Sequence, residues 1–349
     1  MMLRGLLFLL CLAAVAPAAG ATDVSPLRSV WPAEPAAAAV EERTVTIASA
    51  SPYSLDRVGT EEAPQTILRA RLFEPAATPP PQGFPAVVLI HGASGVREAR
   101  EITYGRQFAS MGVSALVIDS FTPRRDMASG FEQRLLNITE TMLISDVYAG
   151  LRWLARRPSV DPDRIALIGF SYGAMVTVFA AYEQVAELLA PEGQRFAAHA
   201  AFYGPCVADF DDERATGAPV LMLLGGRDEI TRPERCEEVA QELRRGGSEV
   251  ELIVLEGAYH QWDGGWPGPR RIGRSLADCR FRVDSEGVAR DSLVGMAMTN
   301  PAMRRVVLGL CSDSDGYLIG ADEAVRARSN SLLGAFLAEA FAKAEPLAQ

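Results

Sequence analysis

The fold is decided by residues 165–178, IALIGFSYGAMVTV, in which Gly169-Phe170-Ser171-Tyr172-Gly173 lies between a predicted strand and a predicted helix. A strand, G-x-S-x-G and a helix in this order are typical of the sharp turn that presents a nucleophilic serine at the carboxyl edge of a sheet. Glycines are needed there because a Cβ at either position would clash with the neighbouring strand or helix. The alternative is a structural glycine turn that happens to contain a serine. We predict that Ser171 is a nucleophile.

Strands and helices alternate on both sides of this turn. The apolar runs are near-continuous, as expected for strands covered on both faces. They lie at residues 86–90, 114–118, 165–168, 200–203, 219–224 and 250–255, with alternating, half-buried strands at 44–47 and 67–73. Further helices are predicted at about 97–110, 139–157, 233–245 and 321–343. This order predicts an α/β fold: a mostly parallel, twisted sheet with helices on both faces and the ligand site at its carboxyl edge.

The chain divides into a leader, a linker and one domain. Residues 1–21 combine a short basic start, an apolar run and a small-residue site, which predicts a cleaved signal peptide; an uncleaved N-terminal anchor is the alternative. Residues 22–43, rich in Ala and Pro, are predicted to be a flexible linker. Residues 44–349 are predicted to form a single domain. Its irregular insertion at about 262–320 is interpreted as a disulfide-stapled lid or pocket wall, with a packing ornament as the alternative.

Four cysteines remain when the predicted leader is removed, and an even set is typical of an oxidising compartment. Among the three possible pairings we favour Cys206–Cys236 and Cys279–Cys311, because each pair would close one supersecondary unit. The protein is therefore predicted to be exported, either periplasmic or secreted, with no membrane span after leader cleavage. The absence of C-x-x-C and the presence of only three histidines argue against a metal site.

The formal net charge of −10 is spread without long runs of one sign. An acidic chain without a basic patch argues against nucleic acid and against an anionic membrane surface as partners. A small molecule is the expected partner.

A serine nucleophile needs a general base. In folds of this type the partners follow in the order serine, acid, histidine. His260 lies on the loop after the strand at 250–255 and is the predicted base. His199, which opens an apolar strand, is the alternative, but a structural role suits that position better.

The acid that orients the base should end the strand between the serine and the histidine. Asp228 comes shortly after the strand at 219–224 and is the predicted acid. Its rivals are Glu229, which would face the other way, and Glu256 at the end of the last strand; a solvated surface carboxylate is the remaining alternative.

Two backbone donors are expected to stabilise the oxyanion of a tetrahedral intermediate. One is the N–H of Tyr172, the residue after the nucleophile. The other should come from residues 91–95, HGASG, which follow the strand at 86–90, and the N–H of Ala93 is the candidate. On the same edge, Arg124 or Arg125 could bind an acidic substrate group, with a solvated charge as the alternative.

Five segments in this order resemble the dienelactone hydrolase family of the α/β-hydrolase superfamily. They are residues 91–95, 117–121, 160–165 with the serine turn, 226–228 and the loop that holds His260. The resemblance implies the α/β-hydrolase fold, no cofactor and a triad of Ser171, Asp228 and His260 that acts on small esters or lactones through an acyl-enzyme. Founding members of the family carry cysteine where this chain has Ser171, so their lactone specificity does not transfer.

The function predicted from the sequence is that of an exported serine hydrolase cleaving carboxylic esters or lactones of small substrates. A serine peptidase or amidase on the same fold is one alternative. A non-catalytic binding protein that has kept the fold is the other.

Overall fold

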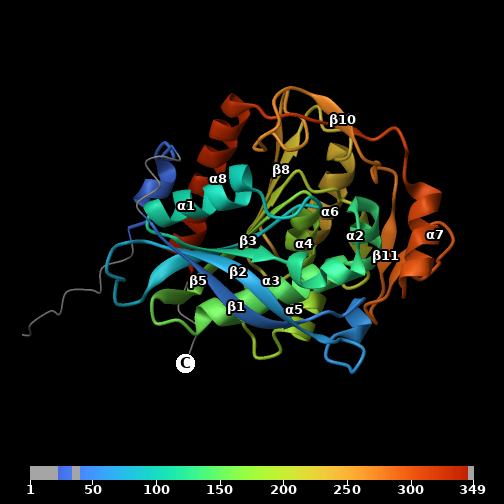
Figure 1. Ribbon diagram of the computed structural model, residues 1–349, viewed down its shortest axis with the longest axis horizontal. Helices are drawn as coiled ribbons and strands as arrows, with labels where there is room; N and C mark the ends of the chain where they lie inside the picture. Colours follow the sequence, from blue (N-terminus) through green and yellow to red (C-terminus); the bar gives the residue numbers. More distant parts are fainter. Residues whose placement is uncertain (1–22, 34–39, 345–349) are drawn as a thin grey trace, which may run out of the picture.

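The computed structural model describes residues 23–33 and 40–344, and an eight-stranded sheet forms its centre (Figure 1). The strand order is β1-β2-β4-β3-β5-β6-β8-β9; β2 runs antiparallel to β1 and β4, and all other neighbours are parallel. The strands are β1 (Glu41–Ala50), β2 (Gln65–Glu74), β3 (Phe84–Ile90), β4 (Ser114–Asp119), β5 (Val160–Phe170), β6 (Ala198–Phe202), β8 (Val220–Gly225) and β9 (Val250–Leu255). The mostly parallel sheet confirms the predicted fold class.

Helices cover both faces of the sheet. On one face α1 and α8 bury side chains such as Phe108 and Leu337, and on the other α3 and α4 bury Val147 and Val176. The helix predicted at 97–110 begins as a π-helical turn, η4 (Glu98–Ile102), before α1. The α-helices are α1 (Thr103–Ser110), α2 (Phe131–Asn137), α3 (Glu140–Ala155), α4 (Tyr172–Phe179), α5 (Glu183–Leu189), α6 (Pro233–Arg245), α7 (Pro301–Cys311) and α8 (Glu323–Lys343). Within the described ranges, no helix is both long and apolar enough to cross a membrane.

The prediction of a flexible linker over residues 22–43 is wrong for residues 23–33, which pack on the domain, and for residues 41–43, which belong to β1. Leu27, in the short helix η1 (Ser25–Arg28), is fully buried, and the indole N–H of Trp31 donates to its carbonyl oxygen at 3.2 Å. That carbonyl oxygen would lie 1.9 Å from a Cβ added at Gly334, so η1 packs directly on α8. Two large apolar side chains anchor this part of the chain, and β1 begins at Glu41. The predicted signal peptide over residues 1–21 lies outside the described residues.

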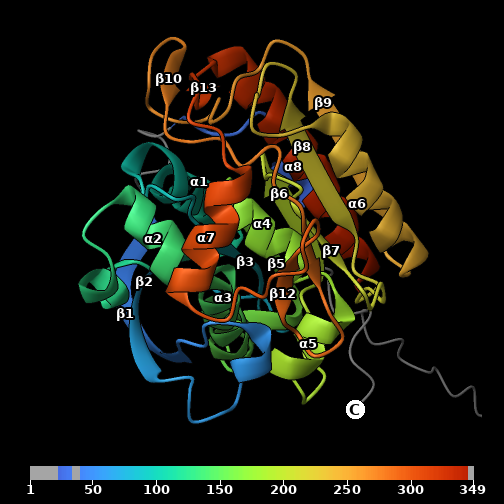
Figure 2. The same ribbon diagram turned by 90° about the vertical axis from the view of Figure 1, so that its right-hand side faces the viewer.

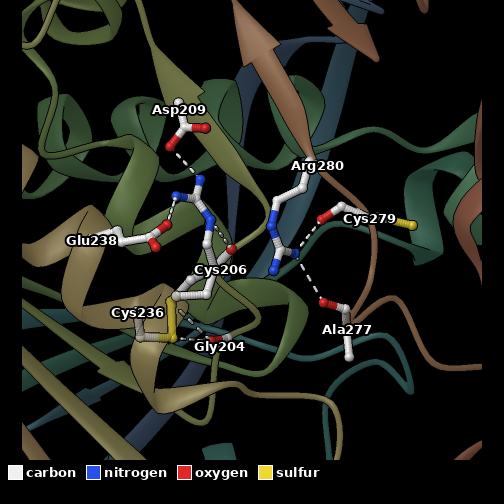
Figure 3. The surroundings of a disulfide bond; sticks show 9 residues. Gly204, Cys206, Asp209, Cys236, Glu238, Ala277, Cys279 and Arg280 are labelled. Atoms are coloured by element: carbon white, nitrogen blue, oxygen red, sulfur yellow. Dashed lines mark hydrogen bonds and ion pairs between the residues drawn. A yellow bond between two sulfur atoms is a disulfide. The ribbon is translucent and has the colours of Figure 1, made fainter. Parts of the chain in front are cut away.

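The insertion at 262–320 forms small sheets and one helix along the carboxyl edge. Strand β10 (Arg270–Ile272) pairs with β13 (Tyr317–Ile319), and β11 (Phe281–Val283) joins β12 (Ala289–Asp291) to β7 (Ala208–Phe210). A disulfide joins Cys279 to Cys311 within the insertion. A second disulfide, shown in Figure 3, joins Cys206 in the loop after β6 to Cys236 on α6. These are the two pairs that the sequence favours.

Two neighbouring carboxyl groups, Asp209 on β7 and Glu242 on α6, are expected to make the stability of the fold depend on pH. The side chain of Glu242 on α6 is buried beside Asp209 and accepts a hydrogen bond from the hydroxyl of Tyr182 at 3.2 Å. Burial, followed by the neighbouring Asp209 carboxyl, raises the pKa of Glu242 to about 8. The folded state therefore holds a proton that the unfolded chain releases at its ordinary pKa near 4.5.

The Glu242→Gln variant should remove this dependence. The stability that the proton contributes is present below about pH 4.5 and is lost as the pH rises through about 8, so the wild type should lose roughly 1–3 kcal/mol between pH 5 and 9. Urea unfolding at both pH values measures the difference, and Glu234→Gln, an exposed position on α6, is the control. Equal pH slopes for Glu242→Gln and the wild type would contradict the prediction.

Candidate active site

Ser171 lies on a strained turn between β5 and α4. Its backbone φ is 53° and ψ is −112°, a conformation that residues other than glycine rarely adopt. A Cβ added at Gly169 would lie 2.1 Å from the carbonyl oxygen of Gly173, and one added at Gly173 would lie 2.4 Å from that of Ile90. Both glycines are therefore required by close backbone approach, and the turn lifts the serine to the carboxyl edge of the sheet.

The structure brings Ser171, His260 and Asp228 together at this edge. Oγ of Ser171 lies 2.8 Å from Nε2 of His260, and Nδ1 of His260 lies 2.7 Å from Oδ2 of Asp228. Because a carboxylate only accepts, Nδ1 carries the proton and Nε2 is free to accept from the serine hydroxyl. The other carboxylate oxygen, Oδ1 of Asp228, accepts from the N–H of Ile230 at 3.0 Å, which fixes the carboxylate. All three side chains are buried, with Ser171 only 7% exposed.

The rival residues lie elsewhere. Glu229 forms an ion pair with Arg271 at 2.8 Å, and Glu256 is exposed. His199 is fully buried in β6 against the ring of Phe196, and burial lowers its pKa to about 4. It is therefore a neutral core histidine.

Two tyrosines that sequence reasoning missed enclose the imidazole of His260. The ring centroid of Tyr203 is 4.8 Å from that of the imidazole and the centroid of Tyr317 is 4.9 Å from it, both edge to face. The insertion also pairs with the backbone: the N–H of His260 donates to the carbonyl oxygen of Leu318 at 3.3 Å, and that of Gly320 donates to the carbonyl oxygen of His260 at 3.1 Å. The end of the insertion is therefore a wall against His260.

A buried polar network holds Tyr203 in place. Its hydroxyl donates to Oδ1 of Asp263 and accepts from Nη1 of Arg100 at 3.3 Å. Nε of Arg100 donates to Oε1 of Glu101 at 2.7 Å, so the buried charges are paired. Burial raises the pKa of Asp263. Tyr203 directly follows β6, so the expectation that site residues come just after strands, which identified Asp228, could also have identified Tyr203. Tyr317 carries no such signal.

The loop at residues 91–95, here called the oxyanion loop, presents one of two unused backbone donors. Within residues 23–33 and 40–344, the N–H groups of Ala93 and Tyr172 donate to no protein acceptor. The carbonyl of Gly92, in the same peptide unit as the Ala93 N–H, accepts from Nδ1 of His91 at 2.8 Å, and Nε2 of His91 accepts from the N–H of Ser120 at 3.1 Å. Burial lowers the pKa of His91, which keeps the ring neutral for this arrangement.

The prediction that Arg124 binds substrate is wrong, and so is the solvated alternative. Arg124 is buried, and its guanidinium forms an ion pair with Asp146 on α3, with Nη1–Oδ2 at 2.6 Å and Nη2–Oδ1 at 2.9 Å. Its remaining donors bind the hydroxyl of Ser51 and the carbonyls of Ser120 and Ala50. All five N–H donors are occupied, so none is left for a substrate. The neighbouring Arg125 extends into solvent, with 80% of its side chain exposed.

The fold and this site are those of an α/β-hydrolase. A family model of the dienelactone hydrolase family matches residues 68–263, more than half of the chain, and the protein belongs to that family. It is therefore a hydrolase that acts on ester bonds. Among the described residues, no cluster of three or more His, Cys, Asp or Glu side chains is placed to hold a metal ion.

Individual relatives are distant. The chain is 23% identical over 194 residues to a protein of Bradyrhizobium sp named as a 2-oxo-3-(5-oxofuran-2-ylidene)propanoate lactonase, covering 50% of this chain and 72% of the relative. It is 25% identical over 198 residues to a protein of Salmonella typhimurium named as a carboxymethylenebutenolidase, covering 51% and 68%. A crystal structure of a dienelactone hydrolase-like promiscuous phosphotriesterase from metagenomic libraries matches with a TM-score of 0.52 at 17% identity, covering 85% and 98%. This last likeness shows the shared fold.

Proposed function

We propose that the protein is an exported serine hydrolase that cleaves carboxylic esters or lactones of small substrates through an acyl-enzyme intermediate. The observation that carries the proposal is the continuous chain from Oγ of Ser171 through the imidazole of His260 to Asp228, with distances of 2.8 and 2.7 Å. A serine hydroxyl is a weak nucleophile at neutral pH, and this arrangement supplies the base and the group that sets its tautomer.

In the proposed first half-reaction, Nε2 of His260 takes the proton from Ser171 as Oγ attacks the ester carbonyl carbon. The developing oxyanion accepts hydrogen bonds from the N–H groups of Ala93 and Tyr172, which have no protein acceptor among the described residues. Asp228 stabilises the imidazolium without taking its proton. The intermediate collapses, the C–O bond to the alcohol breaks, and the alcohol oxygen takes the proton from His260.

In the second half-reaction, water replaces the alcohol. His260 takes a proton from the water, whose oxygen attacks the acyl carbon, and the intermediate expels Ser171, which recovers its proton from the imidazole. With a lactone, the alcohol and the acid are released as one molecule. Because Ser171 is only 7% exposed and His260 is fully buried, we expect the enzyme to prefer small acyl groups.

Two features support export. Both disulfides lie in the part of the chain that shapes the carboxyl edge, and such bonds persist in oxidising compartments. Together with the leader-like composition of residues 1–21, they favour a periplasmic or secreted enzyme with one domain, which comprises residues 44–349 as predicted and also the packed segment 23–33 and the start of β1 at Glu41.

Pre-steady-state kinetics with p-nitrophenyl acetate test the acyl-enzyme route. If deacylation is slower than acylation, we expect a burst of p-nitrophenol equal to the enzyme concentration, followed by a linear phase. A panel of short esters, lactones and the matching p-nitroanilides tests the substrate class in parallel. We expect turnover of the esters or lactones well above that of the anilides; faster cleavage of the anilides would indicate an amidase instead. Turnover of none of these substrates would contradict the proposal.

A further inference from the structure

Helix α2 is tied to the oxyanion loop by one arginine. None of its residues is fully buried, yet Nη1 of Arg134 donates to the carbonyl oxygen of Ala93 at 3.1 Å. The same guanidinium lies over the ring of Phe121, with Cζ 5.3 Å from the centroid. Phe121 in turn packs against His91, with ring centroids 4.5 Å apart. The side chain of Arg134 therefore links α2 to Ala93 in the loop and to Phe121, which packs against His91 of the same loop.

This contact completes the support of the Ala93 donor. On one side of Ala93, the peptide that carries its N–H is held by His91 through the carbonyl of Gly92. On the other side, the next peptide is held by Arg134 through the carbonyl of Ala93. We infer that Arg134 is a positioning residue that fixes the oxyanion loop so that the Ala93 N–H faces the reacting carbonyl. The inference rests on the proposed function, in which that N–H binds the oxyanion.

The insertion in turn fixes α2. Arg304 on α7 is buried; its Nε donates to the carbonyl oxygen of Leu135 at 2.7 Å, and its Nη2 lies 2.7 Å from Oε1 of Glu140. The hydroxyl of Tyr53 donates to the carbonyl oxygen of Leu136 at 2.9 Å. These carbonyls belong to the last turn of α2, where the carbonyl oxygens find no N–H donors within the helix itself. Helices α2 and α7 consequently lie side by side (Figure 2).

A path of contacts therefore leads from the disulfide-closed insertion to the oxyanion loop. Cys311, the last residue of α7, is bonded to Cys279, and Arg304 on the same helix holds the end of α2. Arg134 on α2 in turn donates to the carbonyl oxygen of Ala93 in the oxyanion loop. The insertion acts on the site from two sides: through β13 on the imidazole of His260, and through α7 and α2 on the oxyanion loop.

Arg134→Met and Arg134→Lys test the positioning role. Methionine keeps an apolar stem over Phe121 but has no donor, and we expect kcat for p-nitrophenyl acetate to fall about tenfold with KM within about twofold of the wild type. Lysine restores a donor and should recover part of the loss. Arg156→Met, at an exposed arginine that follows α3, is the matched control and should behave like the wild type.

The affinity for a trifluoromethyl ketone inhibitor distinguishes positioning of the oxyanion loop from a purely structural role of Arg134. It forms a tetrahedral adduct with a serine nucleophile, so its affinity for Arg134→Met should fall by the same factor as kcat/KM, while acetate inhibition and the melting temperature stay unchanged. Unchanged kinetics, or a rise in KM alone, would overturn the inference; the second result would mean that Arg134 contacts substrate. Parallel losses of melting temperature and activity without rescue by lysine would also overturn it.

The link to the insertion is tested by a double-mutant cycle. Arg304→Met is made together with Glu140→Gln, so that no buried carboxylate is left unpaired, in the wild type and in Arg134→Met. If the insertion acts through Arg134, the pair should lower kcat in the wild type but add little in Arg134→Met. Fully additive losses would overturn the link.

A fluorophosphonate probe separates this inference from the proposed function. If the wild type is not labelled at Ser171, the proposed function itself fails. If the wild type is labelled and Arg134→Met reacts with the probe at the same rate, the proposed function stands and the role of Arg134 is rejected.

Discussion

Replacing Ser171 by alanine should lower kcat for p-nitrophenyl acetate by about 10⁶-fold, close to the complete loss of catalysis by a triad. Alanine removes the Oγ that lies 2.8 Å from Nε2 of His260 and leaves no group able to form an acyl-enzyme. Residual hydrolysis should come from the two backbone donors and from substrate binding alone. Steady-state rates at saturating substrate measure the effect.

Ser331→Ala is the control for this variant because Ser331 is exposed on α8, on the face of the sheet far from α4. It should retain wild-type rates. Both variants should melt at the wild-type temperature, since a buried serine and alanine differ little in volume. A Ser171→Ala protein that hydrolyses the ester as fast as its parent would contradict the proposed nucleophile.

Replacing Asp228 by asparagine should lower kcat by about 10⁴-fold while leaving the fold intact. The asparagine amide matches the carboxylate in shape, and its oxygen can still accept from the N–H of Ile230 at the position of Oδ1. Its NH2 group would then face Nδ1 of His260 and donate to it, which moves the ring proton to Nε2. A protonated Nε2 cannot accept from the hydroxyl of Ser171.

Glu229→Gln is the matched control for Asp228→Asn. It makes the same chemical change one residue along the chain, at a carboxylate that is paired with Arg271. We expect wild-type kcat for Glu229→Gln. Comparable losses in the two variants would show that the loop tolerates no change and would remove Asp228 from its assigned role. Equal activity of Asp228→Asn and the wild type would do so directly.

The fold and the three central residues could be predicted because they obey one geometric rule. Ser171, Asp228 and His260 each come shortly after a predicted strand, and parallel strands end at the same edge of a sheet. The glycines on either side of Ser171 added a second signal, since the close approach of β3 and α4 leaves no room for a Cβ. Local patterns of this kind were sufficient for the sheet and for the placement of the side chains above it.

Residues whose partners lie far away in the sequence could not be assigned in this way. Arg124 also follows a strand, but its role is set by Asp146 on α3, and no local pattern distinguishes a buried arginine with a distant carboxylate from one that awaits substrate. Tyr317 reaches His260 only after an irregular insertion, where neither helical nor strand periodicity predicts which side chains return to the site. Arg134 contacts the loop from a seven-residue helix that was not predicted.

The segment around Leu27 was predicted to be flexible but is packed against the domain. Its composition is rich in Ala and Pro, which suggested a flexible linker, but Leu27 and Trp31 are buried against α8 and α1. Average composition conceals such anchors because the free energy of burial is concentrated in a few side chains.

The proposed mechanism depends on Oγ of Ser171 becoming covalently bonded to the acyl group. Treating the protein with a fluorophosphonate and mapping the adduct by peptide mass spectrometry tests this most directly. We expect a single modification, on Ser171, that forms at the rate at which ester hydrolysis is lost. An adduct on another residue, or full loss of hydrolysis with Ser171 unmodified, would contradict the account.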